Sequence, residues 1–302
     1  MPAIVNTNSP SEISDPKTPL TLNWYTTTNS PVFSYSSGVF LNGNHYIQHG
    51  ADNLWKYHVK DKRYERLNTG IFGLHGNYSK LIIDVQNDSA YSISCDESRS
   101  VYMYFLSGGL SNIEVPGKFA SAALLDGFRL GQFYPVVWNS KIYTFGGTTN
   151  ASPTNVVYEI DPKTMTFLSY STLPVPLRYP NVTFDGEENV YITCGALNVG
   201  TNFSDKFNLR TKESVELPKP GHGVTGFGGY LNYVGKGRIH YACGQNTAYR
   251  EMFYIDKNKW VRLEDGNPTC FASSIYDPNE DSVHTHGGYI GGWNTYHNVY
   301  KM

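Results

Sequence analysis

The sequence predicts an all-β fold, a six-bladed β-propeller of four-stranded antiparallel blades. A short pattern of alternating side chains that ends in a turn recurs six times along the 302 residues, at a spacing of roughly 50 residues. Aromatic residues make up 15% of the chain and include 24 Tyr, a composition that favours strands over helices. The 29 Gly and 16 Pro are spread along the chain and indicate many turns. A single all-β domain of this length is ordinary.

The clearest copy of the repeat is KIYTFGG at residues 141–147, which reads as a strand that enters a tight turn. The other copies are NHYIQHG (44–50), SAYSISC (89–95), NVYITCG (189–195), RIHYACG (238–244) and DSVHTHGG (281–288). A strand, turn, strand pattern follows most copies, as in MFYIDKNKWVRL (252–263). One further apolar strand precedes each copy, as in YPVVW (134–138). Four strands per unit is the content of one propeller blade.

The two ends of the chain are expected to close the ring. The sixth unit stops at HNVYKM (297–302), after its third strand. The segment LTLNWYTTT (20–28) supplies the missing outer strand, with Trp24 in the position of a late aromatic residue. Pairing these segments covers an edge that would otherwise be open. We therefore expect residues 1–19 to form an N-terminal extension and residues 20–302 to form one propeller domain.

One position of the repeat carries His or Cys in five of the six copies. These residues are His49, Cys95, Cys194, Cys243 and His286. A ring of metal ligands is one interpretation, but facing sheets pack about 10 Å apart, too far for ligands that must lie about 2.0–2.3 Å from one ion. A packed layer between blades is the interpretation we adopt. His284 and His286 share one strand face and could supply two metal ligands, but the sequence places no third ligand beside them, so we expect no metal.

Several function classes are not expected. The net charge of −2, without a basic stripe, disfavours nucleic acid as a partner. No run of about 18 apolar residues is present, so no membrane span is expected. The start MPAIVNTNSP lacks the features of a signal peptide, which predicts a cytoplasmic protein, or a secreted one if a leader preceded this start. Motifs for phosphate loops, nucleophile elbows and zinc proteases are not found. We expect no cofactor and a small-molecule substrate as the partner.

The tandem pattern resembles the kelch repeat, over nearly the whole chain from about residue 20. The best matches are KIYTFGG with YEIDPKT, and FYIDKNKWVRL with Trp260. Only blades three and six keep both glycines, and the late Trp is replaced by Tyr64, Phe167 or Val215 elsewhere. The resemblance implies a propeller that binds its ligand at one end of the central channel.

The loops before the inner strands and after the glycine turns are predicted to share that end of the channel. The long connection 116–135 contains ASAALL, whose helix propensity predicts a short lid helix. An apolar cup with a few convergent polar groups is the usual small-molecule site. The predicted substrate-binding residues are His75, Tyr78, Phe128, Phe133, Tyr134, Arg178, Tyr179, Phe227, Gln245, Arg250, Trp293 and Tyr296. The predicted catalytic residues are Arg129, His297, His222 and Tyr249.

Two kinds of function fit these loops. The first is a cofactor-independent enzyme that orients a hydrophobic or aromatic substrate and polarises a carbonyl through His, Arg or Tyr, for a cyclisation, cycloaddition or isomerisation. In its architecture the chain resembles propeller proteins of fungal secondary metabolism, among them hetero-Diels–Alderases that join tropolone quinone methides to terpenes. The second is a kelch-type module that binds a peptide, a protein or a carbohydrate without catalysis. The loops differ sharply from blade to blade, which favours one asymmetric site.

Overall fold

The structure is a computed structural model of the 302-residue chain. The residues it describes are 24–26, 30–31, 36–49, 53–69, 80–93, 101–106, 110, 119–125, 127–150, 152–193, 203–221, 228–242, 248–267, 270–289 and 294–302. These residues form strands and turns and contain no helix, so none of them makes an apolar helix of membrane-spanning length.

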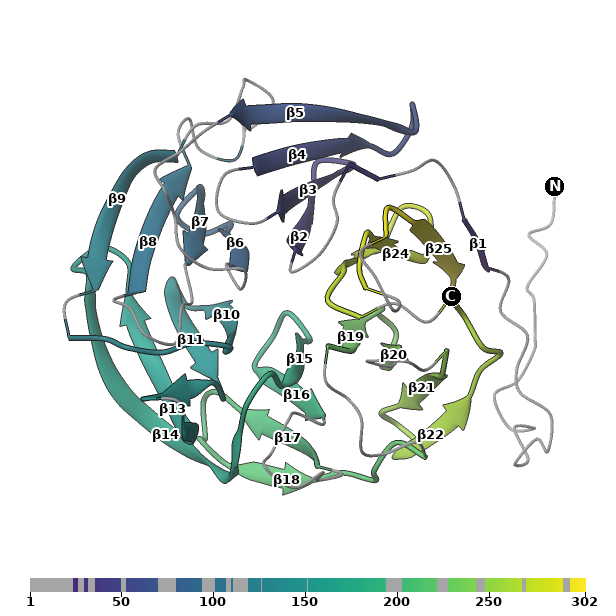
Figure 1. Ribbon diagram of the computed structural model, residues 1–302. Helices are drawn as coiled ribbons and strands as arrows, with labels where there is room; N and C mark the ends of the chain where they lie inside the picture. The colour runs from purple at the N-terminus through teal and green to yellow at the C-terminus, as the bar shows by residue number, and fades with distance from the viewer. Residues whose placement is uncertain are drawn as a thin grey trace, which may run out of the picture.

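The described strands form six antiparallel sheets arranged in a ring (Figure 1). Blade one contains β2 (Ser36–Leu41), β3 (Asn44–His49), β4 (Asn53–His58) and β5 (Arg63–Thr69). Blade two contains β6 (Lys80–Asp84), β7 (Ser89–Ile93), β8 (Val101–Leu106) and β9 (Phe119–Leu125). Blade three contains β10 (Tyr134–Trp138), β11 (Lys141–Phe145), β12 (Thr148–Thr149), β13 (Ser152–Asp161) and β14 (Thr166–Leu177).

The remaining strands complete the ring. Blade four contains β15 (Asn181–Phe184), β16 (Asn189–Thr193), β17 (Ser204–Asn208) and β18 (Ser214–Glu216). Blade five contains β19 (Tyr230–Tyr233), β20 (Arg238–Ala242), β21 (Arg250–Tyr254) and β22 (Lys259–Arg262). Blade six contains β23 (Ser273–Asp277), β24 (Ser282–His286), β25 (His297–Lys301) and β1 (Trp24–Thr26). The predicted all-β propeller is confirmed.

The ring closes through both ends of the chain, as predicted. Strand β1 pairs antiparallel with β25 and places Trp24 opposite Tyr300. The Thr26 hydroxyl also donates to Asn298 Oδ1 at 2.9 Å. The first described strand is therefore the outermost strand of the last sheet, and the outer edge of β25 is covered.

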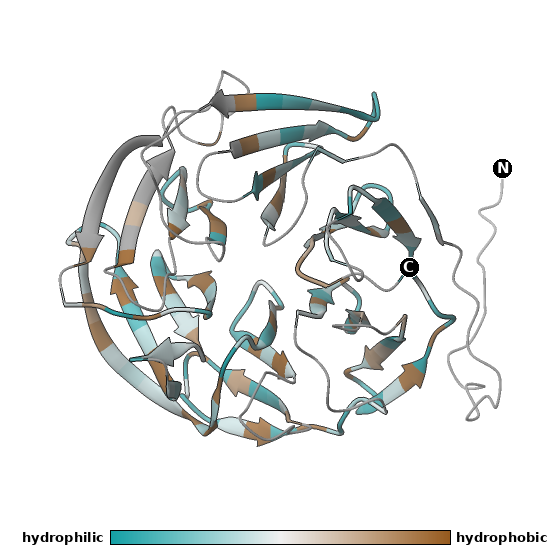
Figure 2. Cartoon of the chain, in the orientation of Figure 1, coloured by the Kyte–Doolittle hydropathy of each residue, from teal (hydrophilic) through white to brown (hydrophobic). Residues whose placement is uncertain are grey.

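The cores lie between neighbouring blades, because each main hydrophobic cluster joins buried residues of two adjacent sheets. Brown, apolar positions accordingly recur on the strands around the ring (Figure 2). The interface of blades three and four holds a large cluster, which includes Phe145 and Phe207 with ring centroids 5.6 Å apart. At the interface of blades six and one, the corresponding cluster contains only Ile47, Tyr57 and Ile275 as buried members. The interface that closes the ring therefore has a small apolar core among the described residues.

Side-chain hydrogen bonds also connect neighbouring inner strands around the channel. The Ser37 hydroxyl of β2 accepts from the Leu81 amide of β6 at 3.1 Å. The Thr183 hydroxyl of β15 accepts from the Tyr233 amide of β19 at 2.8 Å. Because each bond satisfies a backbone donor beside the channel, the inner strands are held at a fixed spacing.

One sequence prediction about blade two is wrong. Residues 119–125, which include ASAALL, form strand β9 and pair with β8 instead of forming a lid helix. The Ala-rich segment has helix propensity, but the hydrogen bonds offered by the open edge of β8 outweigh that weak local preference. The outer strand of blade two is therefore β9.

Trp260 fills the late aromatic position of blade five, on β22. Its ring packs 5.0 Å from that of Phe253, and its indole N–H donates to the Pro218 carbonyl at 2.7 Å. We expect Trp260→Ala to destabilise the fold by about 2 kcal/mol, below the range for a fully buried aromatic because the side chain is only partly buried. Urea unfolding checks this value, and Trp260→Phe, which keeps most of the packing, is expected to lose less than half as much. An unchanged midpoint for Trp260→Ala contradicts this placement.

Candidate functional site

A pocket lies at the mouth of the channel, where the inner strands begin. All six blades contribute to its lining, through Ser36, Lys80, Tyr134, Asn181, Tyr230 and Ser274 among others. A second hollow continues from it between the inner strands of blades one to four. The ring thus gathers residues that are far apart in the sequence around one opening.

Aromatic side chains form much of the pocket wall. Phe133, Tyr134, Tyr179, Tyr230 and Phe271 all line it. The rings of Tyr179 and Phe271 meet edge to face, with centroids 6.4 Å apart. Burial raises the pKa of the Tyr134 phenol, which therefore keeps its proton at neutral pH and can donate a hydrogen bond. Aromatic walls with a few hydrogen-bonding groups suit a small molecule with flat apolar faces.

The rim of the pocket repeats one unusual backbone conformation. Gln132, Tyr179, Gly228 and Phe271 have φ values of 57°, 51°, 75° and 57°, and each lies two residues before an inner strand. Bulky residues rarely adopt this left-handed conformation, which costs roughly 1–2 kcal/mol per residue. The Tyr179 amide donates to the Gln132 carbonyl at 3.1 Å, and the Phe271 amide donates to the Gly228 carbonyl at 3.0 Å. The backbone of the rim is therefore strained, and hydrogen bonds between neighbouring blades hold it in this conformation. Strained backbone of this kind is concentrated at ligand-binding sites.

Two cations lie beside these aromatic groups. The Lys80 ammonium is 5.5 Å from the centre of the Tyr134 ring. The Arg178 guanidinium is 5.2 Å from the Tyr179 ring and donates through Nε to Gln132 Oε1 at 2.6 Å. Positive charge next to an apolar wall favours a ligand with an anionic group or a polarised carbonyl.

The structure brings part of the predicted site together. Phe133, Tyr134 and Tyr179 line the pocket, and Arg178 contacts its rim through Gln132. The predicted residues outside the described part of the chain are His75, Tyr78, His222, Phe227, Gln245 and Trp293.

Other predicted residues lie elsewhere in the fold. Phe128 is buried in the core between blades two and three, and Arg129 and Tyr296 are exposed. The Arg262 guanidinium covers the Tyr249 ring at 3.4 Å from its centroid. Arg250 is buried between blades five and six, where Nε donates to His240 Nε2 at 3.2 Å. None of these five lines the pocket.

Sequence reasoning missed several lining residues. Lys80, Gln132, Tyr230 and Phe271 were not selected, although each stands at or just before the start of an inner strand. The sequence did contain a signal for these four residues. Every inner strand enters the channel from the same end, so the residues at the predicted starts of the inner strands are expected to lie together. The left-handed backbone conformation of the rim had no such signal, since only Gly228 of its four residues is a glycine.

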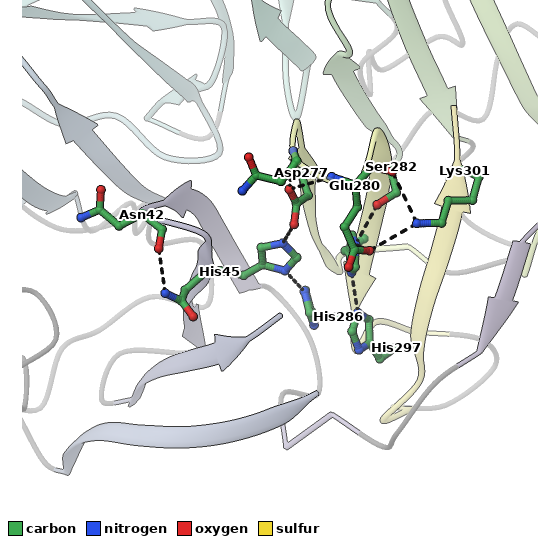
Figure 3. A network of polar contacts seen from close by, with 11 residues as sticks. Asn42, His45, Asp277, Glu280, Ser282, His286, His297 and Lys301 are labelled. Carbon is green, nitrogen blue, oxygen red and sulfur yellow. Dashed lines mark hydrogen bonds and ion pairs between the residues drawn. The ribbon is translucent and has the colours of Figure 1, made fainter. Parts of the chain in front are cut away.

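A second group of chemically active side chains lies between blades six and one (Figure 3). His45 of β3, His284 and His286 of β24, and His297 of β25 are all buried. His45 Nδ1 is 3.0 Å from His286 Nε2, and His284 Nδ1 is 2.9 Å from His297 Nε2. The rings of His286 and His297 stack with centroids 4.1 Å apart. We call these four residues the histidine cluster.

The histidine cluster is uncharged at neutral pH. Burial is the main cause that lowers the pKa of all four imidazoles, and it brings the pKa of His297 to about 3. The structure therefore places His297, predicted as catalytic, inside a neutral cluster away from the pocket lining. The expectation that no third ligand lies beside His284 and His286 is wrong, because His45 belongs to the adjacent blade and joins them.

The repeated His/Cys position is only partly described. Phe145 and His286 are buried at this position and His49 is partly buried, which fits a packed layer. The Cys residues of that register, 95, 194 and 243, lie outside the described residues.

Comparison with known proteins agrees with this fold. Residues 135–174, which span blade three from β10 into β14, match the family model described as the Kelch motif. A solved structure titled "Structure of YjhT" is similar, with a TM-score of 0.69 and 13% sequence identity, over 91% of this chain and 95% of that one. No curated protein matches. The chain is therefore a β-propeller that carries a kelch motif in blade three.

Proposed function

We propose that the protein binds a small aromatic molecule with an anionic or carbonyl group in the pocket at the channel mouth. The observation that carries the proposal is the convergence of five aromatic residues on an opening lined by all six blades. Lys80 supplies a positive charge beside Tyr134 and gives the ligand a preferred orientation. The lining residues differ from blade to blade, which supports one asymmetric site over the repeated sites of a lectin.

We further propose that a bound molecule undergoes a non-redox cyclisation, cycloaddition or isomerisation. The rigid aromatic wall would hold a substrate in a reactive conformation. The Lys80 ammonium and the protonated Tyr134 hydroxyl would stabilise negative charge on a carbonyl oxygen. Peptide or protein binding at the same mouth is the alternative function.

The test uses calorimetry with two probes of matched shape, 1-naphthoate and neutral 1-naphthalenemethanol. We expect the wild-type protein to bind both probes and to prefer the carboxylate. Lys80→Met is expected to weaken naphthoate binding roughly 10-fold, a loss of about 1.4 kcal/mol, and to leave the neutral probe nearly unaffected. Equal losses for the two probes would contradict the role of Lys80.

The aromatic wall is tested with Tyr179→Gly. This change removes the ring and also relieves the left-handed backbone at φ 51°. We expect both probes to bind roughly 10-fold more weakly while the unfolding midpoint stays within a few degrees of wild type. Asn258→Gly is the matched control, because Asn258 has φ 49° on an exposed turn outside the pocket lining. Unchanged binding in Tyr179→Gly, or no binding of either probe to the wild type, overturns the proposal.

A further inference from the structure

The interface between blades six and one, which closes the ring, buries few apolar side chains and several polar ones. Its apolar cluster has only three buried members in the described residues, Ile47, Tyr57 and Ile275. The histidine cluster and the Asp277 carboxylate occupy the same interface and are buried. Burying polar groups is unfavourable unless they are well paired. Four buried imidazoles at the interface between the first and last blades therefore point to a specific role for this interface.

The ring nitrogens are spaced as metal ligands are. His45, His284 and His286 each offer one nitrogen, and these three atoms lie within 4.8 Å of one another. In a tetrahedral site with Zn–N bonds of about 2.0–2.1 Å, ligand nitrogens are roughly 3.4 Å apart. To surround an ion, the two close pairs at 3.0 Å and 2.9 Å need to open by a few tenths of an ångström, and the wider separations among the three atoms need to close by up to roughly 1.4 Å. In the second pair, His297 Nε2 lies 2.9 Å from His284 Nδ1 and is the candidate for a fourth ligand once the cluster contracts around an ion.

The outward-facing nitrogens of the three histidines meet oxygen atoms. His45 Nε2 lies 3.6 Å from Asp277 Oδ2, and His286 Nδ1 lies 2.7 Å from the Tyr64 hydroxyl. His284 Nε2 lies 2.9 Å from the Ser282 hydroxyl. Metal-bound histidines almost always pass their other N–H to a carboxylate, carbonyl or similar acceptor. Once the inner nitrogens bind an ion, the outer N–H groups of His286 and His284 have an acceptor already in place, and that of His45 needs only a small approach of Asp277 to form its hydrogen bond.

The charge around the cluster also suits a cation. Asp277 is buried beside His45, and Glu280 Oε2 lies 3.6 Å from His284 Nε2 (Figure 3). Glu280 Oε2 is also paired with Lys301 Nζ at 3.3 Å, so Asp277 is the carboxylate that offsets part of the charge of a divalent ion beside otherwise neutral ligands. An all-imidazole ligand set favours zinc, copper or nickel over magnesium or calcium, which prefer oxygen.

We propose that the histidine cluster binds one divalent transition-metal ion of the zinc type, with His45, His284, His286 and His297 as ligands. Four protein ligands in a buried position are typical of a structural site. Because His45 belongs to blade one and the other ligands belong to blade six, the ion would join the first and last blades across the closing interface. This departs from the expectation that the chain holds no metal.

The experiment titrates the full chain, stripped with EDTA, with Co²⁺ and follows the visible absorption bands of the tetrahedral ion. We expect one equivalent of Co²⁺ per chain, displacement of the bands by Zn²⁺, and a rise in Tm when Zn²⁺ is added. His286→Gln is expected to lose roughly 100-fold or more in affinity, and Asp277→Asn about 10- to 100-fold with a changed spectrum. His58→Gln is the matched control, because His58 pairs with Glu65 at 2.7 Å outside the cluster.

Each result of the Co²⁺ titration either supports or overturns the proposed metal site. If the folded wild-type chain binds no Co²⁺, or binds it without tetrahedral bands, the proposal is overturned. The same holds if His286→Gln and Asp277→Asn bind as tightly as wild type, or if His58→Gln loses the ion. Should His286→Gln fail to fold, Asp277→Asn and the wild-type titration still decide the question.

Discussion

Replacing Gly147 with Ala is expected to destabilise the protein by about 4 kcal/mol, the largest effect of any single substitution considered for this fold. Gly147 follows β11, and its φ of +108° is closed to other residues without strain. A Cβ atom there would lie 2.6 Å from the Gly131 carbonyl oxygen and 3.0 Å from Phe133 Cβ. The Gly131 oxygen accepts from the Thr148 amide at 2.7 Å, so it cannot move away without breaking that bond.

The matched control for this change is Gly186→Ala. Gly186 also has a positive φ, +89°, but nothing lies within 4 Å of a Cβ built there. Its substitution should therefore cost only the backbone strain, about 1 kcal/mol. Urea unfolding of the two variants measures the difference, with similar m-values expected for both. Equal losses in the free energy of unfolding for the two variants would contradict the close packing of the glycine turn against residues 131–133.

The second large effect is a loss of stability in acid that depends on His240. This side chain of β20 is fully buried and accepts a hydrogen bond from Arg250 Nε at Nε2. Burial, with the nearby Arg250 charge as a second cause, holds the pKa of His240 well below its ordinary value of 6.5. The folded protein therefore binds fewer protons at this site than the unfolded chain does.

The sign of the effect follows from that difference. The stabilisation from neutral His240 is complete above about pH 6.5 and is lost as the pH falls, at about 1.4 kcal/mol per pH unit. From pH 6.5 down to the folded-state pKa of His240, this one site should therefore lower the free energy of unfolding steadily. His240→Gln keeps an acceptor for Arg250 but does not titrate, so its free energy of unfolding should fall less over the same pH range. Identical pH profiles for wild type and His240→Gln would show that His240 does not titrate in this way.

The fold was predictable from the sequence because each blade repeats the same local pattern. Alternating side chains before a turn, as in KIYTFGG, mark the second strand of each blade, and the pairing of β1 with β25 followed from a missing fourth strand. Strand β9 was not predictable, because FASAALL carries no strand signal and its conformation depends on the edge of β8. The glycine pairs of blades three and six have positive φ at both positions, a conformation that glycine adopts without strain.

The candidate site was predictable only in part. Phe133, Tyr134 and Tyr179 could be selected because they stand at or just before the start of an inner strand, next to loops rich in aromatic residues. The histidine cluster could not, since His45 and His286 are 241 positions apart and meet only when the ring closes. Contacts made across that joint leave no periodic signal in either segment.

All six blades build the pocket at the channel mouth, and the proposed function depends on this pocket. A crystal structure of the protein with 1-naphthoate tests this most directly. We predict electron density for the naphthalene ring between Tyr134, Tyr179 and Phe271, with its carboxylate facing Lys80. Density for the probe on the outer surface alone, with the channel mouth filled only by water, would contradict the account.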